Sequence, residues 1–345
     1  MASHFSAITL ILFLTLGCSQ NIIANSDETR AAAEAALAEG PTALVALAEK
    51  GNAAAQFFLA QNYQSGTSAT LDMIQAAAWF SLAAEQGHIE AQYQLGMAYS
   101  QGAGIEQDLN QGAYWFEESA EQGFVDAQFA TGNVYARGEG VEQDFEEAVD
   151  WYLEAATQTE FLSNAIGGAQ HALGLAYASG SGVEQNDLTA AQWYARAATR
   201  NNVNAQYSLG VIYEAGRGVE QDIVVASEWY RRAADQGDAN AEYNLGIAYA
   251  KGNGVTPDLT EAASWFKRSA EQGNASAQYN LAVMLAQGRG IDVDTIEAQK
   301  WFSIAATVGD VDAMAARDQI ATALSPEQND EAKERADIWL SQIER

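Results

Sequence analysis

Aromatic side chains recur at regular intervals and are the residues best suited to binding. We call seven of them the aromatic lane: Phe57, Tyr93, Phe129, His171, Tyr207, Tyr243 and Tyr279. Tyrosine gives a large contact area at a small cost in side-chain entropy and keeps a polar tip, so the lane suits an extended peptide or a sugar. Asn244 and Asn280 follow two of its members, and their amides could hydrogen-bond a bound backbone. The alternative is that the lane packs neighbouring helices and binds nothing.

A second recurring position changes its charge along the chain. It holds Glu118 and Glu154 first and arginines later, reinforced by adjacent basic residues. We call the basic members the basic strip: Arg196, Arg231, Arg232, Lys267 and Arg268. Against a net charge of -29, such a strip could orient an acidic partner. The alternative is a solvated face whose cations pair with the protein's own acids.

Catalytic, metal-binding and cofactor-binding motifs are absent from the sequence. It contains no G-x-S-x-G, no H-E-x-x-H and no glycine–lysine phosphate loop. One cysteine and three histidines leave little for a metal centre. The acidic charge repels phosphate backbones and anionic lipid head groups. We therefore expect no enzyme, no metal, no cofactor and no nucleic-acid partner.

The N-terminus has the pattern of an export signal. The uncharged apolar run over residues 7–16 is too short to span a bilayer and fits the core of a signal peptide. Cys18 follows Gly17, which resembles the lipobox of bacterial lipoproteins. The resemblance implies a signal peptide over 1–17, a lipidated Cys18 and a tether over 18–30. The protein would then be exported to the periplasm or outer membrane, attached to a membrane only through Cys18; a conventional cleaved signal is the alternative.

The elements that carry the lane and the strip are internal repeats. Tryptophan marks seven of them, at positions spaced by 36 residues with a single gap of 42: Trp79, Trp115, Trp151, Trp193, Trp229, Trp265 and Trp301. In the unit over 89–123, Ala91, Leu95 and Ala98 share one face of a helix, and Ala113, Phe116 and Ala120 share one face of the next. Such an antiparallel helix pair cannot bury its apolar face alone, so the repeats must stack.

Capping and small residues recur in step with the tryptophans. A helix-capping side chain precedes each second helix: Asp72, Asp108, Asp144, Asn186, Asp222, Asp258 and Asp294. Glu147, Glu261 and Glu297 stand three residues later and predict capping boxes. Gly96 lies inside a first helix, where it costs about 1 kcal/mol relative to alanine. It recurs in four later repeats, and we expect close approach of the partner helix to offset that cost.

The combined pattern A-x-x-x-L-G-x-x-Y-x-x-G-x-G-V-x-x-D-x-x-x-A-x-x-W-x-x-A-A-x-x-G resembles the Sel-one-like repeat family, a relative of the tetratricopeptide repeats. The resemblance covers residues 53–310 and implies an all-α fold, an α/α solenoid or superhelix of seven helix-turn-helix repeats. We expect one capping helix over 31–52, an extra loop over 159–168, and capping helices over 311–345. Ala332, Ala336, Trp339 and Ile343 would cover the last repeat.

The repeats and the export signal together predict a non-enzymatic scaffold of the bacterial cell envelope that binds a polypeptide in a concave groove. In tetratricopeptide-like stacks, the side corresponding to the aromatic lane lines that groove. Two alternatives are a lipid-anchored assembly factor for exopolysaccharide export and a secreted factor that binds a host protein.

Overall fold

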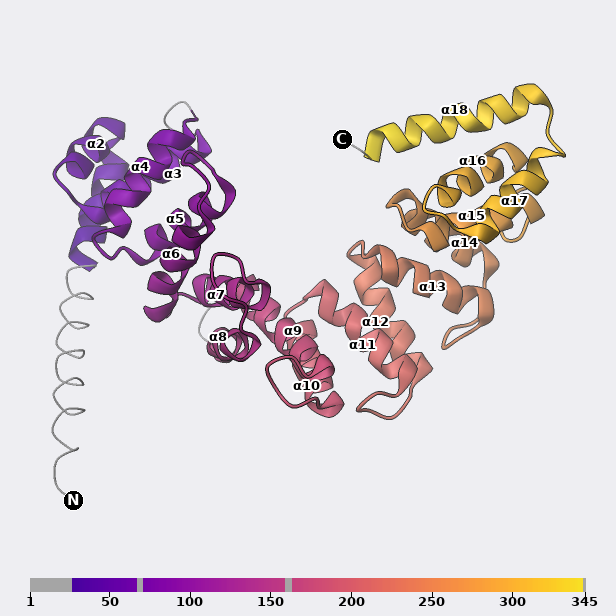
Figure 1. Ribbon diagram of the computed structural model, residues 1–345, viewed down its shortest axis with the longest axis horizontal. Helices are drawn as coiled ribbons and strands as arrows, with labels where there is room; N and C mark the ends of the chain where they lie inside the picture. Colours follow the sequence, from indigo (N-terminus) through magenta and orange to yellow (C-terminus); the bar gives the residue numbers. More distant parts are fainter. Residues whose placement is uncertain (1–26, 67–70, 159–162, 344–345) are drawn as a thin grey trace, which may run out of the picture. The chain divides into compact units, whose positions relative to one another are not determined.

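The computed structural model describes residues 27–66, 71–158 and 163–343, which are helical and contain no strand (Figure 1). The expected signal peptide, Cys18 and most of the expected tether lie outside these residues. Two compact units divide the chain: residues 1–169 with 181–183, and residues 170–180 with 184–345. None of the helices in the described part is long and apolar enough to cross a membrane.

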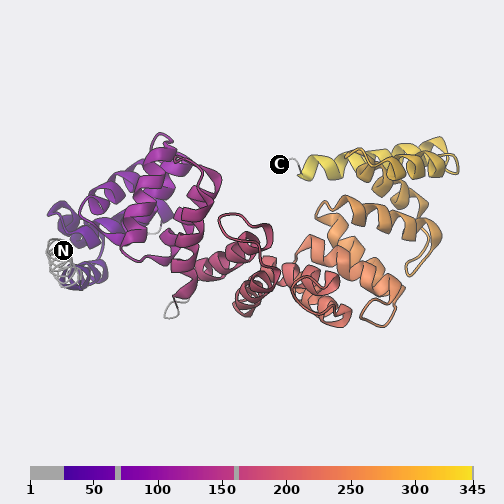
Figure 2. The ribbon, with the colours of Figure 1, turned by 60° about the horizontal axis from the view of Figure 1, so that its bottom comes forward.

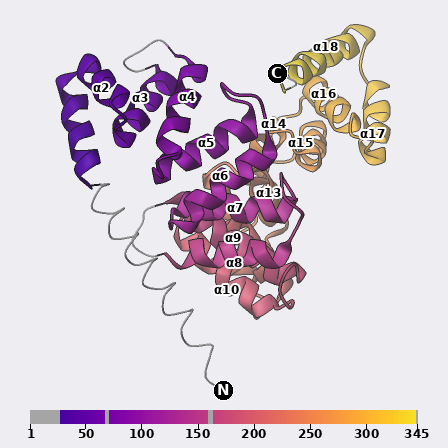
Figure 3. The same cartoon turned by 60° about the vertical axis from the view of Figure 1, so that its left-hand side comes forward.

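The first unit is built from consecutive helix pairs that pack on their neighbours (Figure 3). After a helix over 27–39, it contains α2 (Pro41–Glu49), α3 (Ala53–Ser65), α4 (Met73–Ala84), α5 (Ile89–Gln101), α6 (Leu109–Glu121), α7 (Val125–Arg137) and α8 (Phe145–Thr157). The start of α9 (Asn164–Ser179) also belongs to this unit. Small residues fill the centre of each pair, as Ala91 and Ala120 do.

The second unit continues the same arrangement from the rest of α9. It contains α10 (Asp187–Thr199), α11 (Val203–Ala215), α12 (Ile223–Asp235), α13 (Ala239–Lys251), α14 (Leu259–Glu271), α15 (Ala275–Gln287), α16 (Thr295–Ala306), α17 (Val311–Ala321) and α18 (Pro326–Ile343). In Figure 2 the yellow C-terminal helix lies beside the last orange helices, and α18 packs on α16. The predicted all-α solenoid is therefore confirmed.

The predicted aspartate caps are present, but the capping boxes are not complete. Asp144 accepts hydrogen bonds from the backbone N–H groups of Glu146 (2.9 Å) and Glu147 (3.1 Å). Its own N–H donates to the carbonyl of Tyr135 in the first helix (3.0 Å) and not to Glu147. This bond ties the start of the second helix to the first helix, so the reciprocal half of the box is not needed.

The glycine inside the first helix of the second to sixth repeats lies against an aromatic ring of the second helix. A Cβ at Gly96 would stand 2.7 Å from the Phe116 ring and 3.1 Å from the Gly112 carbonyl oxygen. At Gly132 the nearest atoms are those of the Tyr152 ring, at 2.5 Å. The predicted close approach of the partner helix is confirmed, and most of the nearest atoms belong to its aromatic ring.

A second glycine fixes how one repeat sits on the one before it. Gly104 has φ 77° and lies against the backbone of Met73, at the start of the preceding second helix. Any side chain here would overlap the Met73 carbonyl oxygen. Gly140 meets Leu109 and Gly290 meets Leu259 in the same way. The glycine therefore combines a left-handed turn with a backbone-to-backbone contact.

The prediction of a single helix over 31–52 was wrong, as was a tether extending to residue 30. A helix already spans 27–39, and α2 starts after a break at Gly40. Gly40 has φ 120°, and Pro41 restricts the residue before it and has no N–H to donate. The proline therefore ends one helix and begins the next.

The prediction of a loop over 159–168 was wrong for its second half. Phe161 and Leu162 lie outside the described residues, but α9 begins at Asn164. Ile166 is fully buried. The described part of the insertion thus lengthens a helix and fills its packing.

The C-terminal helices cover the last repeat, as predicted. Ala332 and Ala336 are buried, and the rings of Trp339 and Trp301 lie 5.6 Å apart. Ser325 forms a true capping box with Gln328: the Gln328 N–H donates to Ser325 Oγ, and the Ser325 N–H donates to Gln328 Oε1. Ile343 is 52% exposed, so the covering stripe stops before it and that part of the prediction was wrong.

Candidate functional site

The aromatic lane packs against the second helix of its own repeat. Ring centroids are 5.9 Å apart for Tyr207 and Tyr230 and 5.7 Å apart for Tyr279 and Phe302. Phe57 is buried, and the other six members are half-buried. The lane therefore contributes to packing within each repeat, and six of its side chains keep part of their surface exposed.

The partner aromatics form a row of which only Phe116 was predicted from the sequence to face the core. They directly follow the tryptophans: Phe80, Phe116, Tyr152, Tyr194, Tyr230, Phe266 and Phe302. The Trp-Phe or Trp-Tyr dipeptide was the signal that could have found them. Burial raises the pKa of Tyr152 and of Tyr194 to about 12, so both hydroxyls stay protonated. Tyr230 donates to Glu214 (2.6 Å).

A pocket lies at the last member of the lane. It has a volume of about 450 Å³, and Tyr279, Val283, Phe302 and Ile320 form much of its apolar wall. Gln287, Thr295, Gln319 and three alanines complete the lining, which contains no charged residue. In a chain with 46 acidic residues, this uncharged wall favours a neutral group.

The two asparagines beside the lane differ in their surroundings. Asn244 borders a hollow of about 10 Å³ together with Tyr230 and Glu214, enough space for about one water molecule. Asn280 donates its side-chain amide to the Ser276 carbonyl in its own helix (3.0 Å). The Asn244 amide also interacts with the hydroxyls of Tyr207 and Tyr230, so both asparagines already have polar contacts within the protein.

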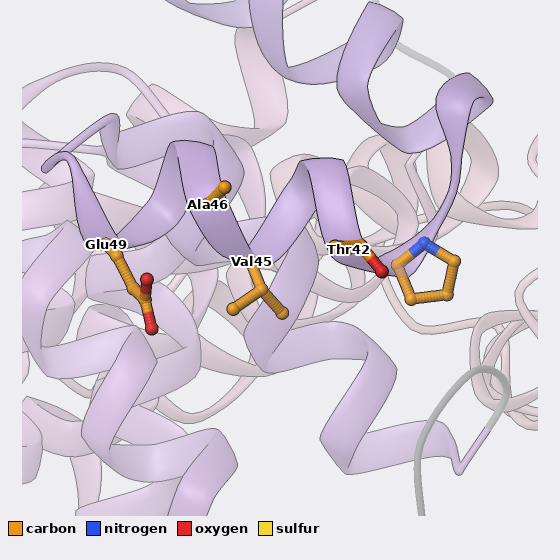
Figure 4. A pocket seen from close by; sticks show the side chains of 5 residues that line it. Thr42, Val45, Ala46 and Glu49 are labelled. Atoms are coloured by element: carbon orange, nitrogen blue, oxygen red, sulfur yellow. The ribbon is translucent and has the colours of Figure 1, made fainter.

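A further depression lies away from the lane, on the first unit. Figure 4 shows it along one face of α2, where Pro41, Thr42, Val45, Ala46 and Glu49 line about 380 Å³. All five come from a single helix. No lane or strip residue takes part in this depression.

The members of the basic strip make different contacts in the structure. Arg196, Arg232 and Arg268 each lie over the tryptophan three residues earlier, 4.5, 4.3 and 4.4 Å from its ring. Arg231 instead donates to the Tyr249 hydroxyl, and Lys267 pairs with Glu271 at 3.9 Å. The five residues predicted as one strip therefore have different surroundings.

A row of buried polar side chains runs beside these arginines, and sequence reasoning missed it. Each directly follows the alanine that begins the apolar face of a first helix, as Gln92 follows Ala91: Gln56, Gln92, Gln128, Gln170, Gln206, Glu242 and Gln278. A glutamine from the end of the second helix donates to most of them, as Gln236 does to Gln206 (2.7 Å) and Gln272 to Glu242 (2.7 Å). We call these residues the glutamine row.

Glu242 is the one acidic member of the glutamine row. It is 1% exposed and pairs with the Arg268 guanidinium at 2.7 Å. Burial raises the pKa of the Glu242 carboxyl, while Arg268 and the Gln272 amide oppose that rise. Removing the Arg268 charge would leave the buried Glu242 carboxylate poorly compensated, whereas the Arg268 side chain, which is 44% exposed, remains solvated without Glu242.

Antiparallel helix pairs stacked at 36-residue steps define an α/α solenoid of the repeat class. The Sel1 repeat model matches residues 53–88, 89–124, 125–159, 168–202, 203–238, 239–274 and 275–310, so the chain belongs to the Sel1 repeat family. Residues 160–167 fall between the third and fourth matches, inside the predicted insertion.

Solved structures agree with this membership. A Sel1 repeat protein from Oxalobacter formigenes shares 33% identity with a TM-score of 0.70, covering 90% of this chain and 93% of its own. The protective antigen c5321 of uropathogenic Escherichia coli, which displays an SLR fold, shares 25% identity with a TM-score of 0.50, covering 87% and 86%. No functionally curated protein matched. Sel1 repeat proteins are generally non-enzymatic scaffolds that bind other proteins.

Proposed function

We propose that this protein is an interaction scaffold of the bacterial cell envelope and that the aromatic lane of its second unit binds a polypeptide. The observation that carries the proposal is the uncharged pocket at Tyr279. It leaves room for an apolar side chain beside an aromatic ring that is already held in place by Phe302. A pre-positioned ring loses little entropy when it meets a ligand.

The lane of the second unit combines partly exposed tyrosine rings with polar groups. Tyr207, Tyr243 and Tyr279 are half-buried, and Asn244 borders the small hollow beside Tyr230. An extended peptide presents side chains at alternate positions, so one side chain can enter the pocket while others lie against the tyrosines. A flat carbohydrate would use the tyrosines but gains less from an apolar pocket.

The envelope location rests on the N-terminal sequence. The apolar run over 7–16 and Cys18 support export with lipid attachment. Metabolic labelling with a palmitate analogue is expected to mark the wild type and not Cys18→Ser. Labelling of both, or recovery of the wild type in the cytosolic fraction, would contradict this part of the proposal.

Photo-crosslinking tests the binding lane directly. p-Benzoylphenylalanine replaces Tyr243 or Tyr279 in separate variants, and Tyr114, which is 46% exposed on α6, is the matched control. In the native cell, we expect protease-sensitive adducts at Tyr243 and Tyr279 that are absent at Tyr114. Adducts that resist protease but yield to periodate would instead support the role in exopolysaccharide export. Equal adducts at all three positions would contradict a specific lane.

A further inference from the structure

The glutamine row determines which arginines of the basic strip are neutralised. In the sixth repeat the row holds Glu242, and its carboxylate pairs with Arg268. In the fourth and fifth repeats the row holds the neutral Gln170 and Gln206. Arg196 and Arg232 occupy the place of Arg268 in these repeats, and each lies over its tryptophan in the same way.

Arg196 and Arg232 are therefore fixed but uncompensated cations. Among the described residues, neither has a carboxylate within ion-pair distance, whereas Arg268 and Lys267 do. Both side chains are exposed. Stacking on Trp193 and Trp229 restrains the guanidinium groups and leaves their N–H edges available, which lowers the entropy lost on binding.

In the third repeat, the position of these arginines holds an acidic residue that is hydrogen-bonded within the protein. Glu154 takes the place of the arginine there and accepts a hydrogen bond from Gln128 of the row (3.1 Å). Glu154 and Arg268 thus each contact the glutamine-row residue of their own repeat, Gln128 and Glu242. Arg196 and Arg232 are the arginines whose row neighbour carries no charge.

We propose that Arg196 and Arg232 form a docking site for a short acidic segment of a partner polypeptide, one that presents two carboxylates. Guanidinium and carboxylate groups match in shape and form charge-assisted hydrogen bonds. The net charge of -29 repels a long polyanion, so the partner is an otherwise neutral or basic protein. A nucleic acid is disfavoured for the same reason.

This site uses a different side of the helix pair from the aromatic lane. Trp265 and Phe266 are consecutive in α14, so their side chains leave the helix about 100° apart. The lane contacts Phe266 and the strip contacts Trp265. The proposal therefore does not depend on peptide binding in the lane.

Exchanging glutamine-row residues between repeats tests the proposal. Gln206→Glu copies the sixth repeat into the fifth and places a buried carboxylate beside Arg232. Glu242→Gln does the reverse and releases Arg268. Gln101→Glu, on an exposed position of α5, is the matched control because it adds the same charge as Gln206→Glu. Circular dichroism confirms that each variant is folded.

Binding is measured by fluorescence anisotropy with a short labelled peptide that carries two glutamates, and with its copy that carries two glutamines. We expect only the glutamate peptide to bind. Its affinity for Gln206→Glu should be about tenfold lower than its affinity for the wild type, which corresponds to the loss of about one ion pair. Binding to Glu242→Gln should tighten, binding to Gln101→Glu should not change, and Arg196→Gln/Arg232→Gln should abolish it.

Three results would overturn the proposal. One is equal binding of the two peptides, and another is an affinity for Gln206→Glu that matches the wild type. The third is tighter, arginine-dependent binding of a single-stranded oligonucleotide, which would assign the site to phosphate. If Gln206→Glu fails to fold, the gain expected from Glu242→Gln decides the question, because glutamine is the usual residue of the row.

Discussion

Trp301 and Trp339 meet edge to face, with ring centroids 5.6 Å apart and an interplanar angle of 72°. The first belongs to the seventh repeat and the second to the C-terminal helix α18. Trp301 is almost fully buried, and Trp339 contributes to that burial. The contact shows that the last repeat depends on a residue outside the repeats for the closure of its apolar face.

Trp339→Ala should therefore destabilise the C-terminal end of the second unit by about 2 kcal/mol, since it removes a large, partly buried side chain. Because repeats couple only to their neighbours, the loss should concentrate in α15 to α18. Hydrogen exchange of the α15 and α16 amides checks this. Ile343→Ala is the control, because Ile343 is 52% exposed. Faster exchange spread evenly over both units would contradict the prediction.

Gly132→Ala should destabilise the first unit by about 1 kcal/mol. Overpacking against the Tyr152 ring costs about 1–3 kcal/mol, and the higher helix propensity of alanine returns part of it. The Tyr152 hydroxyl holds the ring in place by donating to Asn133 (3.0 Å). Tyr152→Phe frees the ring and should reduce the cost.

A double-mutant cycle in urea measures this coupling. Alanine already occupies the same place in the first and seventh repeats, at Ala60 and Ala282, where the partner rings are Phe80 and Phe302. Equal losses for Gly132→Ala with and without Tyr152→Phe would show that the hydroxyl plays no part.

His171 should make the protein less stable in mild acid. Burial lowers its pKa to about 4, against about 6.5 in the unfolded chain. The unfolded state therefore binds more protons below pH 6.5, so the contribution is complete above that pH and is lost as the pH falls towards 4. At about pH 5 the loss is roughly 2 kcal/mol.

His171→Tyr, which copies the lane residue of the next repeat, should remove this component. Urea midpoints at neutral pH and near pH 5 compare the two proteins, and the wild type should show the larger drop. His88 is present in both, so its own lowered pKa cancels from the comparison. An equal drop of the urea midpoint in both proteins would argue against a buried, neutral His171 imidazole.

Asp222→Ala should cost about 1 kcal/mol. The Asp222 carboxylate accepts from the N–H groups of Val224 and Val225, both at 3.0 Å, and its removal leaves these donors without a protein partner. Asp235→Ala, at the exposed end of α12, removes the same charge without removing a cap. Thermal unfolding of the two variants should differ, and equal midpoints would refute the role of the cap.

Periodic positions made the fold predictable from the sequence. The tryptophan spacing, the aspartate caps and the turn glycines each repeat seven times or nearly so, and local rules fix what they do. The break at Gly40-Pro41 was missed because the alanine-rich pattern continues through it. The helical half of 159–168 was missed because no repeat offers a template for it.

The candidate site was harder to predict because its meaning depends on pairs of residues from different helices. Arg196, Arg232 and Arg268 each lie three residues after a repeat tryptophan, and only contact with the glutamine row separates Arg268 from Arg232. The Tyr279 pocket likewise depends on α17, which lies outside the repeats and shows little periodicity. Side chains that meet only when helices pack are far apart in the sequence, so no local sequence pattern predicts their contact.

The contact between Gly104 and Met73 has a consequence for how such proteins change over time. Each joint of this kind joins main chain to main chain and does not depend on which side chains the two repeats carry. A 36-residue unit that keeps this glycine therefore presents the same backbone joint to the repeat before it. The number of repeats and the identity of their surface residues can therefore change separately at such joints.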